Sequence, residues 1–260
     1  MTYEMIRTAR DRDVLTITLN RPERLNAAPP QMFDEIGQVL DNMDGARALL
    51  ITGEGRAFCS GADLAGRGER SVSGGDGAYQ ALTTSYNPVM LKLSRLGIPI
   101  VSAVNGPAAG IGCSLALAAD FVVMGQSAYF LQAFVNIGLV PDGGASWMLA
   151  RLIGKARATE MMLLGDRIHG PRAAEWGLVY RCVNDGSVVG EAQALAARLA
   201  AGPTLALGIM RQNLAAALDS DYATALLREA EGQRVAGSSN DAVEGATSFL
   251  MKRKAVFAGR

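Results

Sequence analysis

Two glycine-rich turns and one aspartate carry the groups that carbonyl chemistry needs. One turn, Gly-Ala-Asp at 61–63, follows a buried apolar run at 48–52, and the other, Gly-Ile-Gly at 110–112, follows an apolar run at 101–104 and begins an apolar helix near Cys113. Glycine permits tight backbone geometry, and the first turn of a helix has N–H groups with no partner inside the helix. Such donors can bind a phosphate, a carboxylate or the oxyanion that develops when a carbonyl compound reacts.

The spacing of the glycines excludes two common phosphate motifs. A dinucleotide fingerprint that starts at Gly110 needs a third glycine at position 115, which is Leu115, and no Gly-Lys-Ser or Gly-Lys-Thr follows at the spacing of a phosphate loop. Carboxylate or oxyanion binding stays open, beside the simpler interpretation that the glycines only let a helix pack against a strand.

Asp142, in the sequence Pro-Asp-Gly-Gly at 141–144, has two interpretations. It follows a proline and precedes a helical pattern, so its carboxylate can cap that helix. It can also serve as a general acid and base, and its pKa would rise toward neutral if Phe130, Leu131 and Phe134 exclude water from it. Those side chains could equally belong to an ordinary core, and capping and catalysis do not exclude each other.

These groups need alternating strands and helices to position them, and the sequence predicts an α/β fold. Short apolar runs indicate strands, and apolar residues at three- and four-residue spacing indicate helices. Strands are predicted at 13–19, 47–52, 99–104, 121–124 and within 176–183, with helices at about 30–43, 79–96, 113–118, 143–152 and 156–164. From Ser187 onward the pattern is helical only, at 188–201, 204–218, 222–236 and 240–252. The glycine- and serine-rich segment 67–77 predicts a mobile loop near the first turn, or else a plain surface loop.

Composition excludes several classes of protein. The 260 residues include 25 basic and 25 acidic side chains, so the net charge favours neither nucleic acid nor a membrane surface as a partner. Polar residues, glycine and proline interrupt the apolar run 98–124, which favours strand, turn and helix over a membrane span. We expect no targeting segment, and three cysteines without a Cys-x-x-Cys pair indicate a reducing, cytoplasmic setting. With His169 as the single histidine, we expect no metal site.

The two turns together resemble a known pair of motifs. The sequences Phe-Cys-Ser-Gly-Ala-Asp-Leu at 58–64 and Ala-Val-Asn-Gly-Pro-Ala-Ala-Gly-Ile-Gly at 103–112 resemble the paired signature of the crotonase (enoyl-CoA hydratase/isomerase) superfamily, and the resemblance extends from residue 19 to 257. It implies an α/β, crotonase-like spiral of β-β-α units with a C-terminal helical trimerisation region. The spiral core with its acyl-CoA site would occupy 1–200 and the helical oligomerisation region 201–260, in a homotrimer or a dimer of trimers.

The resemblance also implies an oxyanion hole. In this superfamily one backbone N–H from each glycine turn holds the thioester oxygen of an acyl-CoA, and the matching positions here are Ala62 and Ile111. Most members have glycine at the second position, so the side chain of Ile111 must point away from the thioester. A preorganised donor of this kind stabilises the negative charge on the oxygen by roughly 3 kcal/mol.

Other positions match residues that contact the acyl-CoA in the superfamily. Arg24 matches a basic residue that faces the phosphates of coenzyme A, and the backbone at Leu25 and Ala27 borders its adenine. Lys252 matches a residue that reaches the coenzyme A of a neighbouring subunit, with a solvated helix end as the alternative. Asp63 either contacts substrate or stabilises its turn. The substrate-binding positions implied are Arg24, Leu25, Ala27, Gly61, Asp63, Leu64, Gly110, Phe134, Phe249 and Lys252.

The group that moves the proton decides the reaction. Hydratases of the superfamily use two glutamates, whose positions here are Ser114 and Phe134, and neither of these side chains is a base. The position of Asp142 carries the working aspartate in isomerase-type members. One carboxyl suffices for a double-bond shift, because the base that takes a proton at one carbon can return it at another.

Within the superfamily the closest resemblance is to the ring-1,2-epoxyphenylacetyl-CoA isomerases of bacterial phenylacetate degradation, and it is carried by the segments at 129–134, 137–142 and 174–179 and by the Lys-Arg-Lys run at 252–254. It implies an acyl-CoA isomerase with Asp142 as acid and base, which shifts the double bond of an enoyl-CoA or converts the epoxide to an oxepin. It implies no cofactor, since coenzyme A is part of the substrate. Two alternatives stay open: an enoyl-CoA hydratase of fatty-acid or aromatic-acid degradation, and a noncatalytic acyl-CoA-binding homologue.

Overall fold

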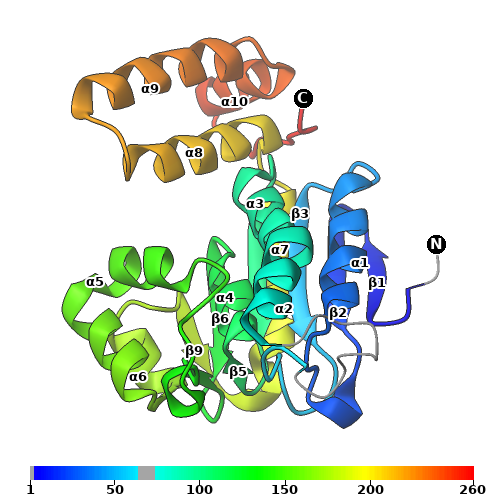
Figure 1. Cartoon of the computed structure of the whole chain (residues 1–260). Coiled ribbons are helices and arrows are strands. Elements are labelled where there is room, and N and C mark those ends of the chain that lie inside the picture. Colours follow the sequence, from blue (N-terminus) through cyan, green and yellow to red (C-terminus); the bar gives the residue numbers. More distant parts are fainter. Residues whose placement is uncertain (1–2, 64–73) are drawn as a thin grey trace.

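A six-stranded sheet forms the centre of the molecule (Figure 1). The computed structural model describes residues 3–63 and 74–260, so the predicted substrate position Leu64 and most of the predicted loop at 67–77 lie outside the described residues. The strands lie in the order β1-β2-β3-β4-β6-β9, so that each strand joins the sheet beside one that precedes it in the chain. Their bounds are Ile6–Asp11, Val14–Leu19, Ala48–Gly53, Ile100–Val104, Phe121–Gly125 and Arg181–Val183.

The pattern of side chains along the strands explains how the sheet is covered. β1 is antiparallel to β2, and all later neighbours are parallel. β3 is buried along its whole length, as expected for a central parallel strand with helices on both faces. Because successive side chains alternate between faces, Leu49 and Ile51 enter one hydrophobic cluster while Leu50 enters another.

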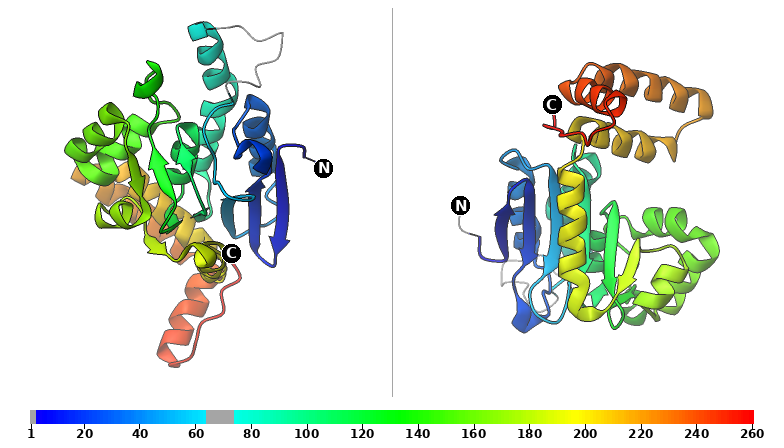
Figure 2. Two further views of the ribbon diagram at one scale, coloured as in Figure 1. Left: turned by 90° about the horizontal axis from the view of Figure 1, so that it is seen from below. Right: turned by 180° about the vertical axis from the view of Figure 1, so that it is seen from behind.

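Helix α7 (Val188–Ala200) covers one face of the sheet (Figure 2). Its buried residues recur every four positions and pack against the small apolar residues of β2, β3, β4 and β6. These helix residues are Val188, Ala192, Ala196 and Ala200. Helices α1 (Pro30–Asp41), α3 (Asn87–Arg95) and α4 (Ile111–Leu117) contribute to the larger cluster on the other face.

A second, three-stranded sheet supports the second glycine turn. It consists of β5 (Ala108–Ala109), β7 (Tyr129–Leu131) and β8 (Arg167–His169), with β7 in the middle. β5 ends immediately before Gly110, whose N–H donates to the carbonyl of Leu131 at 2.9 Å. The small sheet therefore fixes the point at which α4 begins.

One predicted helix differs in the structure. The segment 79–96 is predicted to be one helix, but α2 (Gly74–Ala81) begins earlier, within the predicted loop at 67–77, and a π-helical turn η2 (Leu82–Tyr86) separates it from α3. The two helices predicted at 143–152 and 156–164 are confirmed, because α5 (Ala145–Leu164) is interrupted at Gly154, whose φ of 74° and ψ of 162° are not helical. The short helix α6 (Gly170–Glu175) follows β8.

The last three helices lie apart from the sheet (Figures 1 and 2). They are α8 (Thr204–Ala217), α9 (Tyr222–Gly237) and α10 (Asn240–Leu250). Arg211 of α8 anchors them by donating to the carboxylate of Asp120 at 2.6 Å and to the carbonyl of Leu93 at 2.7 Å. Across the described ranges 3–63 and 74–260, no helix combines the length and apolar character required to cross a membrane.

The four long strands and the C-terminal helices that the sequence predicted are confirmed. The prediction missed β1, because this edge strand buries Ile6 alone and exposes its other five side chains. It also missed β5, β7 and β8, which have only two or three residues each and so show no periodicity.

Candidate active site

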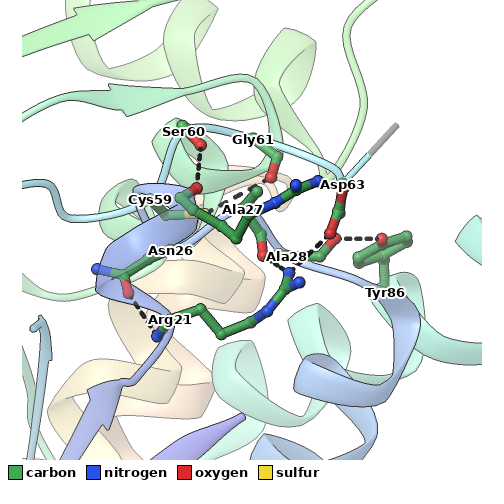
Figure 3. A network of polar contacts seen from close by, with 10 residues as sticks. Arg21, Asn26, Ala27, Ala28, Cys59, Ser60, Gly61, Asp63 and Tyr86 are labelled. Atoms are coloured by element: carbon green, nitrogen blue, oxygen red, sulfur yellow. Dashed lines mark hydrogen bonds and ion pairs between the residues drawn. The ribbon is translucent and has the colours of Figure 1, made fainter. Parts of the chain in front are cut away.

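Two backbone hydrogen bonds to Ala28 hold the first glycine turn, so that the N–H of Ala62 points away from Ala28. The N–H of Ala28 donates to the carbonyl of Gly61 at 2.8 Å, and the N–H of Asp63 donates to the carbonyl of Ala28 at 3.0 Å (Figure 3). Because neighbouring residues of an extended segment point their backbone groups to opposite sides, the N–H of Ala62 faces away from Ala28. Within residues 3–63 and 74–260, this N–H donates no hydrogen bond.

The second turn has a matching free donor. α4 begins at Ile111, two residues earlier than predicted, because Gly110 takes φ 51° and ψ −125° as the residue before the helix. The N–H of Ile111 lies in the first helical turn and has no partner inside the helix. It donates to no other described residue. The side chain of Ile111 is 1% exposed and belongs to the hydrophobic core.

The two turns are in direct contact. The N–H of Ala109 donates to the carbonyl of Cys59 at 2.9 Å. A Cβ on Gly61 would lie 3.2 Å from the carbonyl oxygen of Ala109, and a Cβ on Gly110 would lie 3.9 Å from the Cα of Gly61. Both glycines also have positive φ, so the approach of the two backbones depends on them. The residues that follow these glycines carry the two free donors.

Asp142 does not cap a helix with its side chain. α5 begins after Gly144, which has no side-chain capping bond, and it is the backbone carbonyl of Asp142 that accepts from the N–H of Ala145 at 3.1 Å. The Oδ1 atom of Asp142 is buried and has no hydrogen-bond partner among the described residues. Burial raises the pKa of this carboxyl to about 6, within the working range of a general acid and base.

Helix α4 holds the loop that carries Asp142. The hydroxyl of Ser114 donates to the backbone carbonyl of Asp142 at 2.9 Å. A Cβ on Gly143 would lie 2.4 Å from the Cδ1 atom of Ile111, so the Ile111 side chain packs closely under this loop. The helix that starts with one free donor therefore also fixes the backbone of Asp142.

Phe130 and Phe134, two aromatic residues that precede Asp142, differ in how deeply they are buried. Phe130 is fully buried in the core, whereas Phe134 is partly exposed and its Cζ lies 3.3 Å from where a Cβ on Gly110 would stand. Phe134 therefore lies at the second turn. Ser114 and Ile111, both identified from the sequence for other reasons, contact the Asp142 loop, and the sequence did not predict these contacts.

Asp63 stabilises its turn through buried charge. Its side chain is 3% exposed and forms ion pairs with Arg21 at 2.8 Å and Arg24 at 3.3 Å. Leu25 and Asn26, in the same loop, both take the left-handed conformation, with φ 51° and 55°. The sequence indicates Arg24 and Leu25 but not Arg21, whose partner lies 42 residues away.

The two fully buried cysteines are poor nucleophiles. Cys59 and Cys113 are buried, and burial raises the pKa of each thiol to about 12, so both are neutral at physiological pH. The described part of the chain contains no group of three or more histidine, cysteine, aspartate or glutamate residues that could hold a metal ion. Two free backbone donors, together with one carboxyl of raised pKa on a loop held by α4, suit proton transfer next to a carbonyl group.

Two predicted substrate positions are not part of this cluster. Phe249 lies in α10 and is 84% exposed, and Lys252 follows the end of that helix. α10 stands at the opposite end of the molecule from β5 and the glycine turns (Figure 1).

Known proteins resemble this chain over its whole length. A family model described as enoyl-CoA hydratase/isomerase matches residues 9–260. The 1,2-epoxyphenylacetyl-CoA isomerase of Escherichia coli (strain K12) is 40% identical over 260 residues, which cover 99% of each chain. A protein of Rhodobacter capsulatus named "Probable enoyl-CoA hydratase" is also 40% identical, over 100% of each chain. The crystal structure of an enoyl-CoA hydratase from Bacillus anthracis matches with a TM-score of 0.93 at 27% identity, covering 99% of this chain and 100% of that one.

Proposed function

The chain belongs to the enoyl-CoA hydratase/isomerase family and has the crotonase-like fold, and on that premise we propose that it is an acyl-CoA isomerase in which Asp142 moves the proton. Relatives of this chain are named as isomerases and as hydratases, so the family name alone does not decide between the two reactions. The observation that carries the proposal is the carboxyl of Asp142, whose Oδ1 is buried without a partner among the described residues and whose pKa is raised by burial to about 6.

The reaction begins with the thioester oxygen between the N–H groups of Ala62 and Ile111. The carboxylate of Asp142 removes a proton from the carbon next to the thioester carbonyl of a 3-enoyl-CoA. The electron pair of the broken C–H bond enters the conjugated system, and negative charge develops on the thioester oxygen. Two preorganised backbone donors stabilise that charge.

The same carboxyl completes the double-bond shift. Protonated Asp142 returns the proton to the far carbon of the dienolate, which yields the 2-enoyl-CoA and regenerates the carboxylate. No water enters the product. Isomerisation of an epoxyphenylacetyl-CoA to the oxepin is a second substrate option, suggested by the name of the Escherichia coli relative.

Hydration is the second candidate function, and the Rhodobacter capsulatus relative named as a hydratase favours it. Against hydration, Ser114 and Phe134 occupy the positions that carry two glutamates in hydratases. Ser114 already donates its hydroxyl to the backbone of Asp142. A hydratase also needs a positioned water, and a single carboxyl would have to both activate that water and protonate the substrate.

Binding of coenzyme A is proposed at the loop beside the first turn. Arg24 has a half-exposed side chain there, and the backbone at Leu25 and Ala27 lies in the same loop. We place the phosphates of coenzyme A at Arg24 and the adenine along this backbone. Gly61, Asp63, Gly110 and Phe134 then surround the thioester end as part of the proposed site.

The C-terminal helices are proposed to form a homotrimer or a dimer of trimers. Large apolar side chains of α8, α9 and α10 are exposed in the single chain, a pattern that marks interaction surfaces. They include Met210, Leu214, Leu227, Val243, Phe249 and Leu250. In such an assembly Phe249 and Lys252 would reach the coenzyme A of a neighbouring subunit. Light scattering of the purified protein tests the stoichiometry.

The deciding experiment follows the product of a 3-enoyl-CoA by mass spectrometry. An unchanged mass with a shifted retention time supports isomerisation, whereas a gain of one water supports hydration. Asp142→Asn is expected to lower the rate by about 10²- to 10⁴-fold, as for loss of a general acid and base. Asp166→Asn, which changes an exposed aspartate after α5, is the matched control and should keep full activity. Full activity of Asp142→Asn would overturn the proposal.

A further inference from the structure

Asp63 is a buried charge with two cationic partners of different character. Its Oδ2 atom accepts from Arg21 at 2.8 Å, and its Oδ1 atom accepts from Arg24 at 3.3 Å. The side chain of Arg21 is only 18% exposed and also donates to the carbonyl of Ala27, so its role is internal. The side chain of Arg24 is 47% exposed. A guanidinium has five N–H donors, so Arg24 can hold Asp63 and an external anion together.

The backbone of the same residue fixes the first oxyanion donor. The N–H of Asp63 donates to the carbonyl of Ala28, which also accepts from the buried hydroxyl of Tyr86 at 2.8 Å (Figure 3). The N–H of Ala28 forms the second hydrogen bond between the two segments, to the carbonyl of Gly61. Ala62 lies between these two contacts, so its N–H can turn only if the backbone of Asp63 or Gly61 moves.

Three backbone hydrogen bonds join the loop that contains Arg24 to the turn that contains Ala62. Besides the pair at Ala28, the N–H of Ser60 donates to the carbonyl of Leu25 at 3.0 Å. The loop that carries Arg24 and the turn that carries Ala62 are therefore joined at three points of the backbone, and the carboxylate of Asp63 is a charged link between them. Only one ion pair separates the Arg24 guanidinium from this carboxylate.

We propose that Asp63 is a positioning residue that couples the binding of a phosphate group at Arg24 to the orientation of the Ala62 N–H. This inference rests on the proposed function, because it takes coenzyme A as the source of the phosphate. The binding energy of the distant nucleotide end is then used at the thioester, where it raises kcat. A thioester without phosphates occupies the same oxyanion hole but leaves Arg24 empty.

The test compares a 3-enoyl-CoA with the same acyl group on N-acetylcysteamine, which has no phosphate. Wild-type protein should show a higher kcat on the coenzyme A thioester. In Asp63→Asn the kcat on the coenzyme A thioester should fall on the order of tenfold, a typical coupling between two sites, and the kcat on the N-acetylcysteamine thioester should change far less. Arg24→Gln should show the same selectivity, and the double variant should be no worse than either single one. Equal losses on both thioesters, or no loss on either, would overturn the coupling.

A second measurement needs no turnover. Infrared spectroscopy of bound butyryl-CoA, a saturated thioester, reports polarisation of the carbonyl through the frequency of its stretching band. The band should shift to lower frequency in wild-type protein and shift less in Asp63→Asn and in Arg24→Gln. If wild-type protein shows this pattern but does not convert a 3-enoyl-CoA, the proposed isomerase function fails and the coupling stands. If it isomerises and the band is the same in all variants, the coupling fails and the function stands.

Two controls address folding. Asp41→Asn removes an ion pair with Lys92, 2.6 Å long and remote from the turns, and should leave both kcat values unchanged. Arg24→Gln leaves the buried carboxylate with Arg21, so it tests the coupling even if Asp63→Asn fails to fold. If Arg24→Gln has the same carbonyl band frequency and the same ratio of the two kcat values as wild-type protein, the result counts against the proposal.

Discussion

The hydroxyl of Ser114 donates a 2.9 Å hydrogen bond to the backbone carbonyl of Asp142. Ser114 lies one helical turn after Ile111, whose N–H is the second proposed oxyanion donor. The proposed donor and the loop of the proposed acid/base residue are therefore held by the same helix. A fixed distance between them matters, because a misplacement of about 1 Å in a reacting geometry can cost about a hundredfold in rate.

Ser114→Ala is expected to lower kcat by roughly ten- to a hundredfold with a smaller effect on KM, because the Asp142 loop loses its tie to α4. Steady-state kinetics with a 3-enoyl-CoA measures this. Ser102→Ala is the matched control, since Ser102 is also fully buried but its hydroxyl has no partner among the described residues. Equal kcat values in the two variants would contradict a positioning role for Ser114.

The rate of isomerisation is expected to depend on the ionisation of Asp142. The first step needs the carboxylate form, and burial raises the pKa of this group to about 6. Below that pH, kcat/KM should fall about tenfold for each pH unit, and above it kcat/KM should level off. A profile from pH 4.5 to 8.5 checks this, with circular dichroism to verify that the protein stays folded. A midpoint near the ordinary aspartate pKa would contradict burial as the controlling factor.

Asp142 is also expected to make the folded state less stable as pH rises. Its folded pKa is higher than its unfolded pKa, so the folded state binds more protons between about pH 4 and 6 and loses stability across that window. Relative to Asp142→Asn, the free energy of unfolding of wild-type protein should decrease by up to about 2 kcal/mol from pH 4 to pH 7 and then stay constant. Urea unfolding of both proteins at each pH measures the difference. A difference that is independent of pH would refute the raised pKa.

Gly110→Ala is expected to reduce activity strongly. A Cβ there would meet the ring of Phe134 at 3.3 Å and force a side chain into the φ 51° conformation, which shifts the donor at the next residue. We expect at least about a hundredfold lower kcat, comparable to loss of one oxyanion donor. In Gly138→Ala the new side chain also takes a positive φ, 70°, but no atom lies within 4 Å of the new Cβ, so this variant controls for a positive φ without a steric contact. The prediction fails if both variants retain similar activity.

The sequence predicted the long strands because their apolar runs are strong local signals, as for β3 and β4. It could not place α4 correctly, since the helix begins where Gly110 adopts an unusual conformation that composition does not encode. The capping interpretation of Asp142 was wrong for a similar reason. The positive φ of Gly143 and Gly144 moves the helix start away from the carboxylate, and local propensity does not reveal such a turn.

The contacts that complete the candidate site join segments far apart in the chain. Ser114 is 28 residues from Asp142, and Arg21 is 42 residues from Asp63. A serine in an apolar helix and an arginine in a polar loop carry no local sign of such partners. The positions of Ala62, Ile111 and Asp142 were identified by resemblance to a family, and their roles in catalysis remain predictions for the experiments above.

The order of the strands has a consequence for synthesis of the chain on the ribosome. Each strand of the main sheet pairs with one that has already been made, so the sheet can grow from one edge while the rest of the chain is still being translated. Helix α7, which covers the face of the sheet that contains Leu50 and Val101, begins only at Val188, after all six strands. Until it emerges, apolar residues such as Leu50 and Val101 face water, and a nascent chain that pauses before this point presents a binding surface to chaperones.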